Sequence, residues 1–225
     1  MVSASNWLSS APDEPVVPSQ PDLVVYLVRH GRCALNAEGV LRGRLDPDLD
    51  EVGRSQAHAL AERLKEVPID RIVSSPLLRA RRTADALAAT TGAEVEVEGA
   101  WADRDYGPWA GHRPDDVAAL FGSVDAAPGV EPRAAFNARA LEAARALARS
   151  ASPTSVVAVV SHDAVLRAVL AGLVAELPDD PDAIELSTGS SSRLELRDGS
   201  WRVTDLNTPP EGPGGAARVS SGPRS

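Results

Sequence analysis

Two histidines, each directly after an apolar run, are the residues best placed for chemistry in this chain. Arg29-His30-Gly31 follows the apolar residues 24–28, and Ser161-His162 follows 156–160. Such runs predict buried strands, and the carboxyl ends of parallel strands are where α/β proteins bind ligands. An Arg-His pair at that place is suited to chemistry on an anion.

A second arginine is expected to join this pair. Arg79 lies one turn into a predicted helix that follows Ser74-Ser75-Pro76, and the N-terminus of a helix favours an anion through its free amides and its dipole. The predicted pocket therefore holds two guanidinium groups, a second imidazole and the amide of Asn36 around His30.

The elements that position these residues alternate between strand and helix. Strands are expected at 24–28, 69–74, 94–97 and 156–160 and in a closing hairpin at 193–203, and helices at 53–67, 77–90, 133–149 and 164–175. This alternation predicts a three-layer α/β/α sandwich with a mostly parallel central sheet. Both histidines then lie at the ends of neighbouring strands on one rim of the sheet.

Composition is that of one soluble domain. The chain has 225 residues, 43% of them hydrophobic, and a net charge of -9. That balance argues against nucleic acid or an anionic membrane as a partner, because both require clustered lysine and arginine. Cys33 is the single cysteine, so no intramolecular disulfide can form, and a cysteine-based metal site is not expected. With no membrane-spanning run or leader pattern in the sequence, a cytoplasmic location is the expectation.

The two ends of the chain differ from the middle. Residues 1–21 and 208–225 are rich in Pro, Ser, Ala and Gly, and such segments bury too little apolar surface to offset their ordering entropy. They are expected to be flexible, which leaves residues 22–207 as the domain. An edge strand or an exposed helix of that domain can support a homodimer.

The order of the motifs resembles the histidine phosphatase superfamily, in its phosphoglycerate mutase-like branch. The motifs, in chain order, are Leu27-Val28-Arg29-His30-Gly31 with Asn36; Arg42-Gly43; Asp48-Leu49 with Gly53 and Gln56-Ala57; Ser74-Ser75-Pro76-Leu77 with Arg79-Ala80 and Thr83-Ala84; Asp103 to Gly107 with Trp109 and Gly111; and Val160-Ser161-His162. They span residues 23 to about 206, nearly the whole expected domain.

The resemblance implies a role for each of these residues. His30 is the nucleophile that becomes phosphohistidine, while Arg29, Arg79 and His162 hold the equatorial oxygens of the phosphoryl group and Asn36 assists. Such fixed donors match a group that spreads negative charge over three oxygens in the transition state. Gly31, Cys33 and Arg42 are further substrate-binding candidates, although Cys33 stands where the family commonly has threonine or serine. No metal and no cofactor is expected.

The proton donor departs from the family pattern. Asp103 aligns with a position that is usually glutamate, and its carboxyl reaches about one methylene less far. Asp163, directly after His162, is an alternative because the acid phosphatase branch draws its donor from such a pair. Asp105 is a third candidate, since residues two apart on an extended segment share a face. Helix capping and a solvated loop charge are the structural explanations for Asp163 and Asp105.

Hydrolysis of a small phosphorylated metabolite is the favoured reaction. Mutase relatives carry an added basic insert after the Asp103 region, whereas residues 115–131 contain no basic residue here. Phosphoglycerate mutase-type transfer is the alternative within the enzyme class. A non-catalytic phosphate-binding or interaction protein on the same scaffold is the alternative outside it, because fold alone does not fix function.

Overall fold

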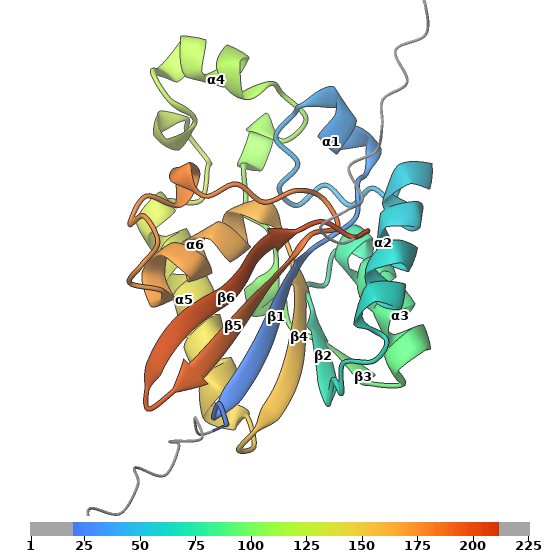
Figure 1. The fold of residues 1–225 in the computed structure, drawn as a ribbon. Helices are drawn as coiled ribbons and strands as arrows, with labels where there is room; N and C mark the ends of the chain where they lie inside the picture. The colour runs from blue at the N-terminus through green and yellow to red at the C-terminus, as the bar shows by residue number, and fades with distance from the viewer. Residues whose placement is uncertain (1–19, 212–225) are drawn as a thin grey trace, which may run out of the picture.

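One six-stranded sheet organises residues 20–211, the part of the chain that the computed structural model describes (Figure 1). The strands are β1 (Leu23–Arg29), β2 (Arg71–Ser74), β3 (Glu94–Val97), β4 (Ser155–Ser161), β5 (Ser191–Arg197) and β6 (Ser200–Thr208). The α-helices are α1 (Ala34–Glu38), α2 (Glu51–Leu64), α3 (Leu78–Thr91), α4 (Pro114–Phe121), α5 (Arg133–Ser150) and α6 (Asp163–Leu173). Four 3-10 helices cover Gly99–Trp101, Gly107–Trp109, Val124–Ala126 and Pro181–Ala183. Most of the two ends expected to be flexible lies outside the described residues.

The strand order is β3-β2-β4-β1-β5-β6. The pairs formed among β1, β2, β3 and β4 are all parallel. Strand β5 is antiparallel to β1, and β6 is antiparallel to β5. Asp198 and Gly199 close the β5–β6 hairpin, both with positive φ (49° and 75°), as a tight turn of the I′ kind requires. The prediction of a mostly parallel sheet with a terminal hairpin is confirmed.

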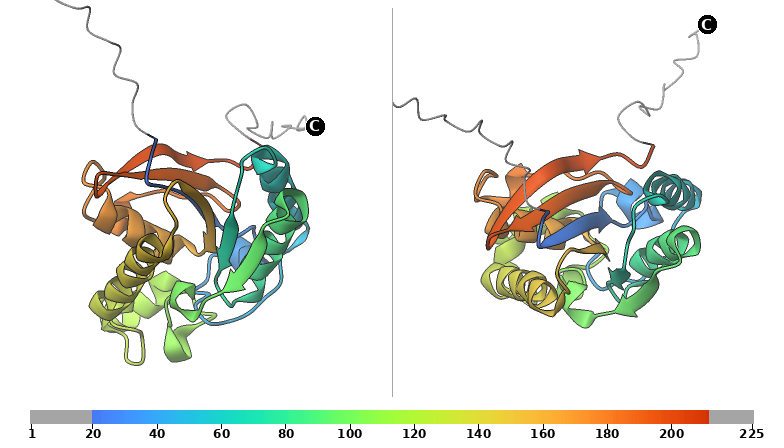
Figure 2. Two further views of the ribbon diagram at one scale, coloured as in Figure 1. Left: turned by 90° about the horizontal axis from the view of Figure 1, so that it is seen from below. Right: turned by 60° about the horizontal axis from the view of Figure 1, so that its bottom comes forward.

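Helices cover the sheet on both faces, and each face has its own hydrophobic cluster. On one face α5 and α6 contribute Phe136 and Leu166 to a cluster that includes Leu27 of β1. On the other, α2 and α3 contribute Leu60 and Leu87 to a cluster that includes Val28. Figure 2 shows the two helix pairs on opposite sides of the sheet. Because successive residues of a strand point to opposite faces, the continuous apolar run in β1 is explained by burial on both sides.

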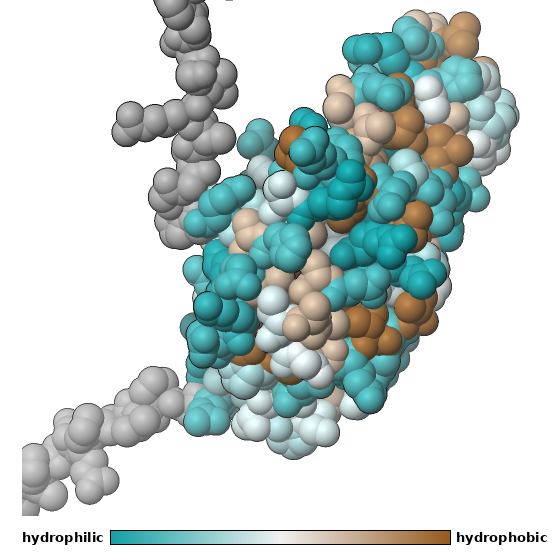
Figure 3. Space-filling view, turned by 90° about the vertical axis from the view of Figure 1, so that its right-hand side faces the viewer, coloured by the Kyte–Doolittle hydropathy of each residue, from teal (hydrophilic) through white to brown (hydrophobic). Residues whose placement is uncertain are grey.

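The exterior over α2 and α3 is mainly hydrophilic, with hydrophobic residues interspersed rather than gathered (Figure 3). This is the pattern expected of helices that bury one stripe and expose the rest. Among the described helices, none combines the length and the apolar character needed to cross a membrane.

A smaller lobe rises above the carboxyl edge of the parallel strands, and no element in it was expected from the sequence. We call residues 34–46 and 104–131 the cap lobe; its helices α1 and α4 stand together at the top of Figure 1. Its two parts are joined through Leu41, whose N–H donates to His112 O (2.9 Å) and whose carbonyl accepts from Gly111 N (2.7 Å). Only three of its hydrophobic residues, Leu41, Val117 and Ala127, are buried.

Candidate active site

Sheet register brings the two histidines together. In the parallel β1–β4 pair, Arg29 lies opposite Ser161, and the backbone N–H of His30 donates to Ser161 O at 3.0 Å. The imidazole rings of His30 and His162 are consequently 5.1 Å apart between centroids. Residues 132 positions apart in the chain thus share one edge of the sheet, as the expected topology requires.

The His30 ring is fully buried and held in one tautomer. Its Nδ1 lies 2.7 Å from Gly31 O, an acceptor only, so Nδ1 carries the proton and Nε2 keeps its lone pair. Nε2 accepts from Nε of Arg79 at 3.3 Å. Burial, followed by the charges of His162 and Arg79, places the pKa of His30 well below its usual value, so the imidazole is neutral at pH 7.

Gly31 allows the backbone after His30 to touch α2. A Cβ at Gly31 would lie 2.4 Å from Gly53 O, and one at Gly53 would lie 1.9 Å from Arg32 O. The N–H of Gly31 donates to Oγ1 of Thr83 on α3 (3.1 Å). The contact therefore fixes the exit of β1 against both helices of that face, and any side chain at either glycine would move His30.

Arg79, the second residue of α3, is completely buried with nearly all of its donors engaged. Nη1 donates to Leu45 O (2.7 Å), and Nη2 donates to Gly43 O (3.0 Å) and to Oδ2 of Asp103 (3.1 Å). Burial lowers the pKa of the guanidinium and the charge of Asp103 opposes that effect. Arg79 thus links His30, the cap lobe and a carboxylate through one rigid group.

His162 is the N-cap residue of α6 and is 1% exposed. Its Nε2 lies 2.6 Å from Oγ of Ser75, and Ser75 Oγ accepts from the N–H of Leu77 at 3.3 Å. The Ser75 hydroxyl is therefore free to donate to Nε2, which leaves the ring proton on Nδ1. That Nδ1 is buried and has no hydrogen-bond partner among residues 20–211; it lies 3.8 Å from Oδ2 of Asp103. Burial and the charge of Arg79 lower the pKa of His162.

Ser75 was not expected to contribute to the site, although its motif was noted. The Ser74-Ser75-Pro76 segment carries the signal, because a serine just before a helix that follows a strand end faces the same rim as the strand itself. The carbonyls of Gly43 and Leu45 were missed as well, since nothing in a sequence reports where a backbone oxygen points.

Arg29 reaches the site from the end of β1 with its side chain 13% exposed. Its Nη1 donates to Leu186 O and lies 3.5 Å from Oδ1 of Asp163. Its Nε is buried without a hydrogen-bond partner, and burial lowers its pKa, against the charge of Asp163. One donor of this guanidinium is thus free for a ligand.

The three candidate proton donors lie in different environments. Asp103 is buried between Arg79 and His162, because the segment before it is fixed: Ser161 Oγ donates to Trp101 O (2.8 Å), and Arg139 donates to Ala102 O (2.8 Å).

Asp163 and Asp105 are engaged elsewhere. Asp163 is the first residue of α6, not its cap as the structural explanation had it, and its carboxylate pairs with Arg29 and with Arg167 (3.1 Å). Asp105 accepts from Gly107 N (2.8 Å) in a segment that is not a strand.

The remaining candidates lie at the border of the site. Oδ1 of Asn36 accepts from the N–H of Cys33 (3.0 Å) and lies 3.0 Å from its Sγ, so these two residues bind each other at the start of α1. Cys33 is fully buried. Arg42 is half-buried in the cap lobe, and its charge contributes to lowering the pKa of His162, after burial and Arg79.

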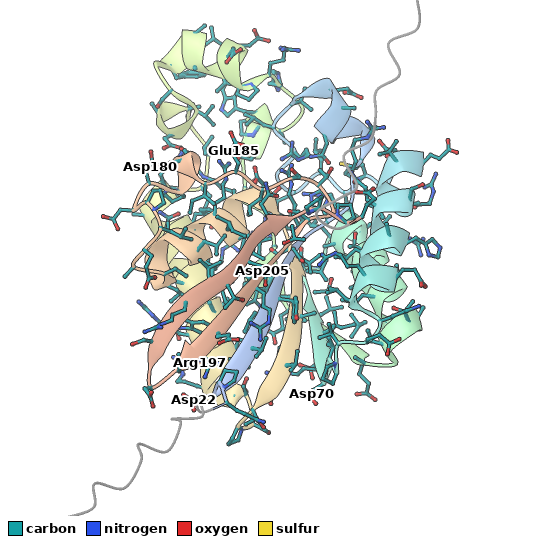
Figure 4. The ribbon with its side chains drawn as sticks, viewed as in Figure 1. Asp22, Asp70, Asp180, Glu185, Arg197 and Asp205 are labelled. Atoms are coloured by element: carbon teal, nitrogen blue, oxygen red, sulfur yellow. The ribbon has the colours of Figure 1, made fainter. Side chains whose placement is uncertain are left out.

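The opposite end of the sheet is built differently. Asp22 and Asp70, labelled low in Figure 4, accept from backbone N–H groups of Asp198 (3.0 Å) and Val156 (2.7 Å). Glu185, in the segment between α6 and β5, lies at the end that carries the histidines (Figure 4). The described residues contain no group of three or more His, Cys, Asp or Glu side chains able to hold a metal ion.

Comparison with known proteins identifies the family. The family model described as histidine phosphatase superfamily (branch 1) matches residues 25–209, and the chain belongs to this superfamily. The chain is 28% identical to the uncharacterized phosphatase PhoE of Bacillus subtilis over 81% of its own length and 93% of that protein. It is 43% identical to a probable phosphoglycerate mutase GpmB of Photorhabdus laumondii, a match that covers 34% of this chain and only 35% of that protein.

A solved structure of a mycobacterial glucosyl-3-phosphoglycerate phosphatase, in complex with VO3, superimposes with a TM-score of 0.72. It is 28% identical, and the match covers 82% of this chain and 98% of the other. The family prediction and the phosphoglycerate mutase-like fold are confirmed.

Proposed function

We propose that this protein hydrolyses phosphomonoesters of small metabolites through a phosphohistidine at His30. The observation that carries the proposal is the tautomer of His30: Nδ1–H donates to Gly31 O, so the Nε2 lone pair faces Arg79 and His162. A neutral, oriented imidazole surrounded by fixed cations and N–H donors is what attack on phosphorus requires.

The first step transfers the phosphoryl group. The phosphorus atom of the substrate occupies the position beside Nε2 of His30 where the free protein has the N–H of Arg79. The bond between Nε2 and phosphorus then forms as the bond to the leaving oxygen breaks. Arg29, Arg79 and the Nδ1–H of His162 bind the equatorial oxygens, which carry the spreading charge in the transition state. The second step reverses the roles: water attacks phosphorus, inorganic phosphate leaves, and His30 is regenerated.

Asp103 is the proposed proton donor. Its carboxyl group lies 3.1 Å from Arg79 and 3.8 Å from His162, beside the place where those two residues would bind the phosphoryl group. In its protonated form Asp103 gives its proton to the leaving oxygen in the first step, and its carboxylate accepts one from the attacking water in the second. Asp163 is the alternative, but its carboxylate pairs with Arg29 and Arg167 and not with Arg79 and His162.

Hydrolysis is proposed over mutase transfer because residues 115–131 contain no basic residue that could hold a bisphosphorylated intermediate. In the structure this segment forms α4 and the 3-10 helix Val124–Ala126 at the top of the cap lobe. Arg29 and Arg79, each paired with a carboxylate, together with two buried histidines, argue for catalysis over simple phosphate binding. We propose roles for Asn36, Cys33 and Arg42 at the border of the phosphoryl site.

Further expectations complete the proposal. Charge stabilisation by arginine and histidine makes a metal unnecessary, and the net charge of -9 argues against nucleic acid as a partner. A cytoplasmic location, a single domain over residues 22–207, and a homodimer through an exposed edge or helix are likewise proposed.

Turnover of p-nitrophenyl phosphate by the purified chain, with and without a chelator, tests the proposal. We expect release of phosphate that the chelator leaves unchanged and that His30→Ala abolishes. Inorganic phosphate binding without turnover at any pH from 5 to 9 would show a binding protein instead. Conversion of 3-phosphoglycerate to its 2-isomer without net phosphate release would show a mutase.

A further inference from the structure

The loop 42–45 of the cap lobe is fixed at the rim of the phosphoryl site. Arg79 holds it through the carbonyls of Gly43 (3.0 Å) and Leu45 (2.7 Å). Gly43 has φ +47°, and a Cβ there would lie 2.9 Å from Arg104 O. The loop is therefore held on both sides, and the two arginines that flank Gly43, Arg42 and Arg44, are positioned by it.

Arg42 has no carboxylate partner within 4.0 Å among residues 20–211, and its Nε is buried without a hydrogen bond. Its one hydrogen bond in the described structure is from Nη1 to Val40 O, at 3.3 Å. Arg29 and Arg79, by contrast, are each paired with an aspartate, at 3.5 and 3.1 Å. Arg44 likewise has no ion pair in the described part of the chain, and it is exposed.

The charge of Arg42 acts on the site itself. Burial is the largest cause of the lowered pKa of Arg29, of Arg79 and of His162, and the charge of Arg42 lowers all three further. A half-buried cation so close to three site residues raises the positive potential of the pocket.

We propose that Arg42, with Arg44 beside it, binds a second anionic group of the substrate, so that the preferred substrates are phosphomonoesters that also carry a carboxylate or a second phosphate. The inference rests on the proposed function. Arg29, Arg79 and His162 supply the donors that one phosphoryl group needs, and the two arginines are each paired with a carboxylate, Asp163 and Asp103. Among residues 20–211 no carboxylate pairs with Arg42, so its guanidinium is left for a further anionic group of the substrate, and guanidinium binds carboxylate and phosphate in the same forked geometry.

Matched substrate pairs test this assignment. One pair is 3-phosphoglycerate and glycerol 3-phosphate, which differ by a carboxylate; the other is fructose 1,6-bisphosphate and fructose 6-phosphate, which differ by a phosphate. We expect at least one pair to show about a tenfold to hundredfold preference in kcat/KM for the bis-anionic member. Arg42→Gln should remove that preference, chiefly through KM, because the second group is bound alike in ground and transition states.

The controls separate a local effect from a general one. Arg42→Lys should restore part of the preference, and Arg44→Gln should reduce it less than Arg42→Gln does. Arg82→Gln, on the exposed face of α3, should leave it unchanged, since Arg82 pairs with Asp48 away from the site. Equal loss of activity on both members of each pair in Arg42→Gln would overturn the assignment, because Arg42 would then hold the transferred phosphoryl group. So would the absence of any preference in the unaltered protein.

Measuring Kd in a variant that cannot turn the substrate over makes this test independent of catalysis. Calorimetric titration of His30→Ala with both pairs should show the same preference in Kd, and His30→Ala/Arg42→Gln should not. A chain that fails to hydrolyse any substrate but retains this difference would refute the proposed function and support the second-anion site. Equal Kd values in His30→Ala, for both pairs, would refute the site alone.

Discussion

The edge of the sheet and the cap lobe both contribute to the site, yet they are built in opposite ways. At the sheet edge His30, His162 and Arg79 are 0–1% exposed and rest on hydrophobic clusters that fill both faces of the sheet. In the cap lobe three buried residues form the whole core, and Leu120 is 69% exposed. The edge thus holds the groups that we propose for phosphoryl transfer, while the lobe brings Arg42, which has no ion pair among residues 20–211.

Asp103 lies where the two regions join. Arg139 of α5 and Ser161 of β4 fix the residues before it, whereas Arg104 after it belongs to the lobe and pairs with Asp125. Asp103, the proposed proton donor, is thereby positioned by the scaffold, and we expect that the lobe beyond it can vary in shape without moving its carboxyl group.

Arg79→Ala should produce the largest loss of any single clamp residue. We expect kcat to fall about a thousandfold on p-nitrophenyl phosphate, because a fixed charged donor to the transition state is removed. The free energy of unfolding should fall too, since Arg79 holds the 42–45 loop. Arg82→Ala, three residues further along the same helix and exposed, is the control. Equal losses of kcat in both variants would show that the buried arginine at the sheet edge has no special role.

Asp103→Asn should depend on the leaving group. An alkyl phosphate needs its leaving oxygen protonated, and we expect a loss of about a hundredfold or more; p-nitrophenolate leaves unaided, and the loss there should stay below about tenfold. Steady-state kinetics on both substrates measures the ratio. Asp163→Asn should show no such selectivity, and the opposite pattern would assign the proton to Asp163.

Acid should destabilise the edge through its two buried histidines. The folded protein holds the pKa of His30 and of His162 below the ordinary value, so below about pH 6.5 the unfolded chain takes up protons that the folded one does not. Their contribution is complete above that pH and is lost as the pH falls, by about 1 kcal/mol per histidine near pH 5.5. Urea unfolding at pH 7.5 and 5.5 measures the difference.

Two variants sharpen the acid experiment. His30→Ala should reduce the pH dependence of the free energy of unfolding by about half. His58→Ala, at an exposed position on α2, should leave it unchanged. A pH dependence that His30→Ala does not alter would place the titrating groups elsewhere.

Trp109→Ala tests the lobe and should have the smallest effect on chemistry. Trp109 packs edge-on against Phe121 (4.9 Å) and His112 (5.7 Å) between ring centroids. Its loss should loosen the lobe, raise KM a fewfold and leave kcat on p-nitrophenyl phosphate within about twofold, because the edge is untouched. A fall in kcat comparable to that of Arg79→Ala would show that the lobe, too, holds the transition state.

The sequence predicts the edge far better than the lobe, for physical reasons. Runs such as 156–160 are apolar throughout because both faces of β4 are covered, and strand-helix alternation brings the carboxyl ends of parallel strands to one edge, so the meeting of His30 and His162 can be foreseen. The lobe has no such periodicity: α1 is five residues long, and proline and glycine interrupt 107–131. Its placement depends on long-range contacts such as Arg104 to Asp125.

Individual side-chain contacts are predictable from the sequence only in part. Arg79 could be assigned to the pocket from its place in a helix, but its bonds to Gly43 O and Leu45 O depend on a loop whose course no pattern reports. Asp163 is an alternative acid on sequence grounds, and its pairing with Arg29 and Arg167 is likewise something that no sequence pattern reports. That Arg42 has no carboxylate partner among residues 20–211 is visible only in three dimensions.

Trapping the phosphoenzyme tests the central claim most directly. Rapid quenching of the unaltered protein with 32P-labelled substrate, followed by peptide mapping, should locate an acid-labile, alkali-stable phosphoryl group on His30. His30→Ala should form none, while His162→Ala, which retains Nε2 of His30, should still be labelled, though slowly. A phosphoryl group on His162 or Cys33, or hydrolysis that survives His30→Ala at an undiminished rate, would contradict the account.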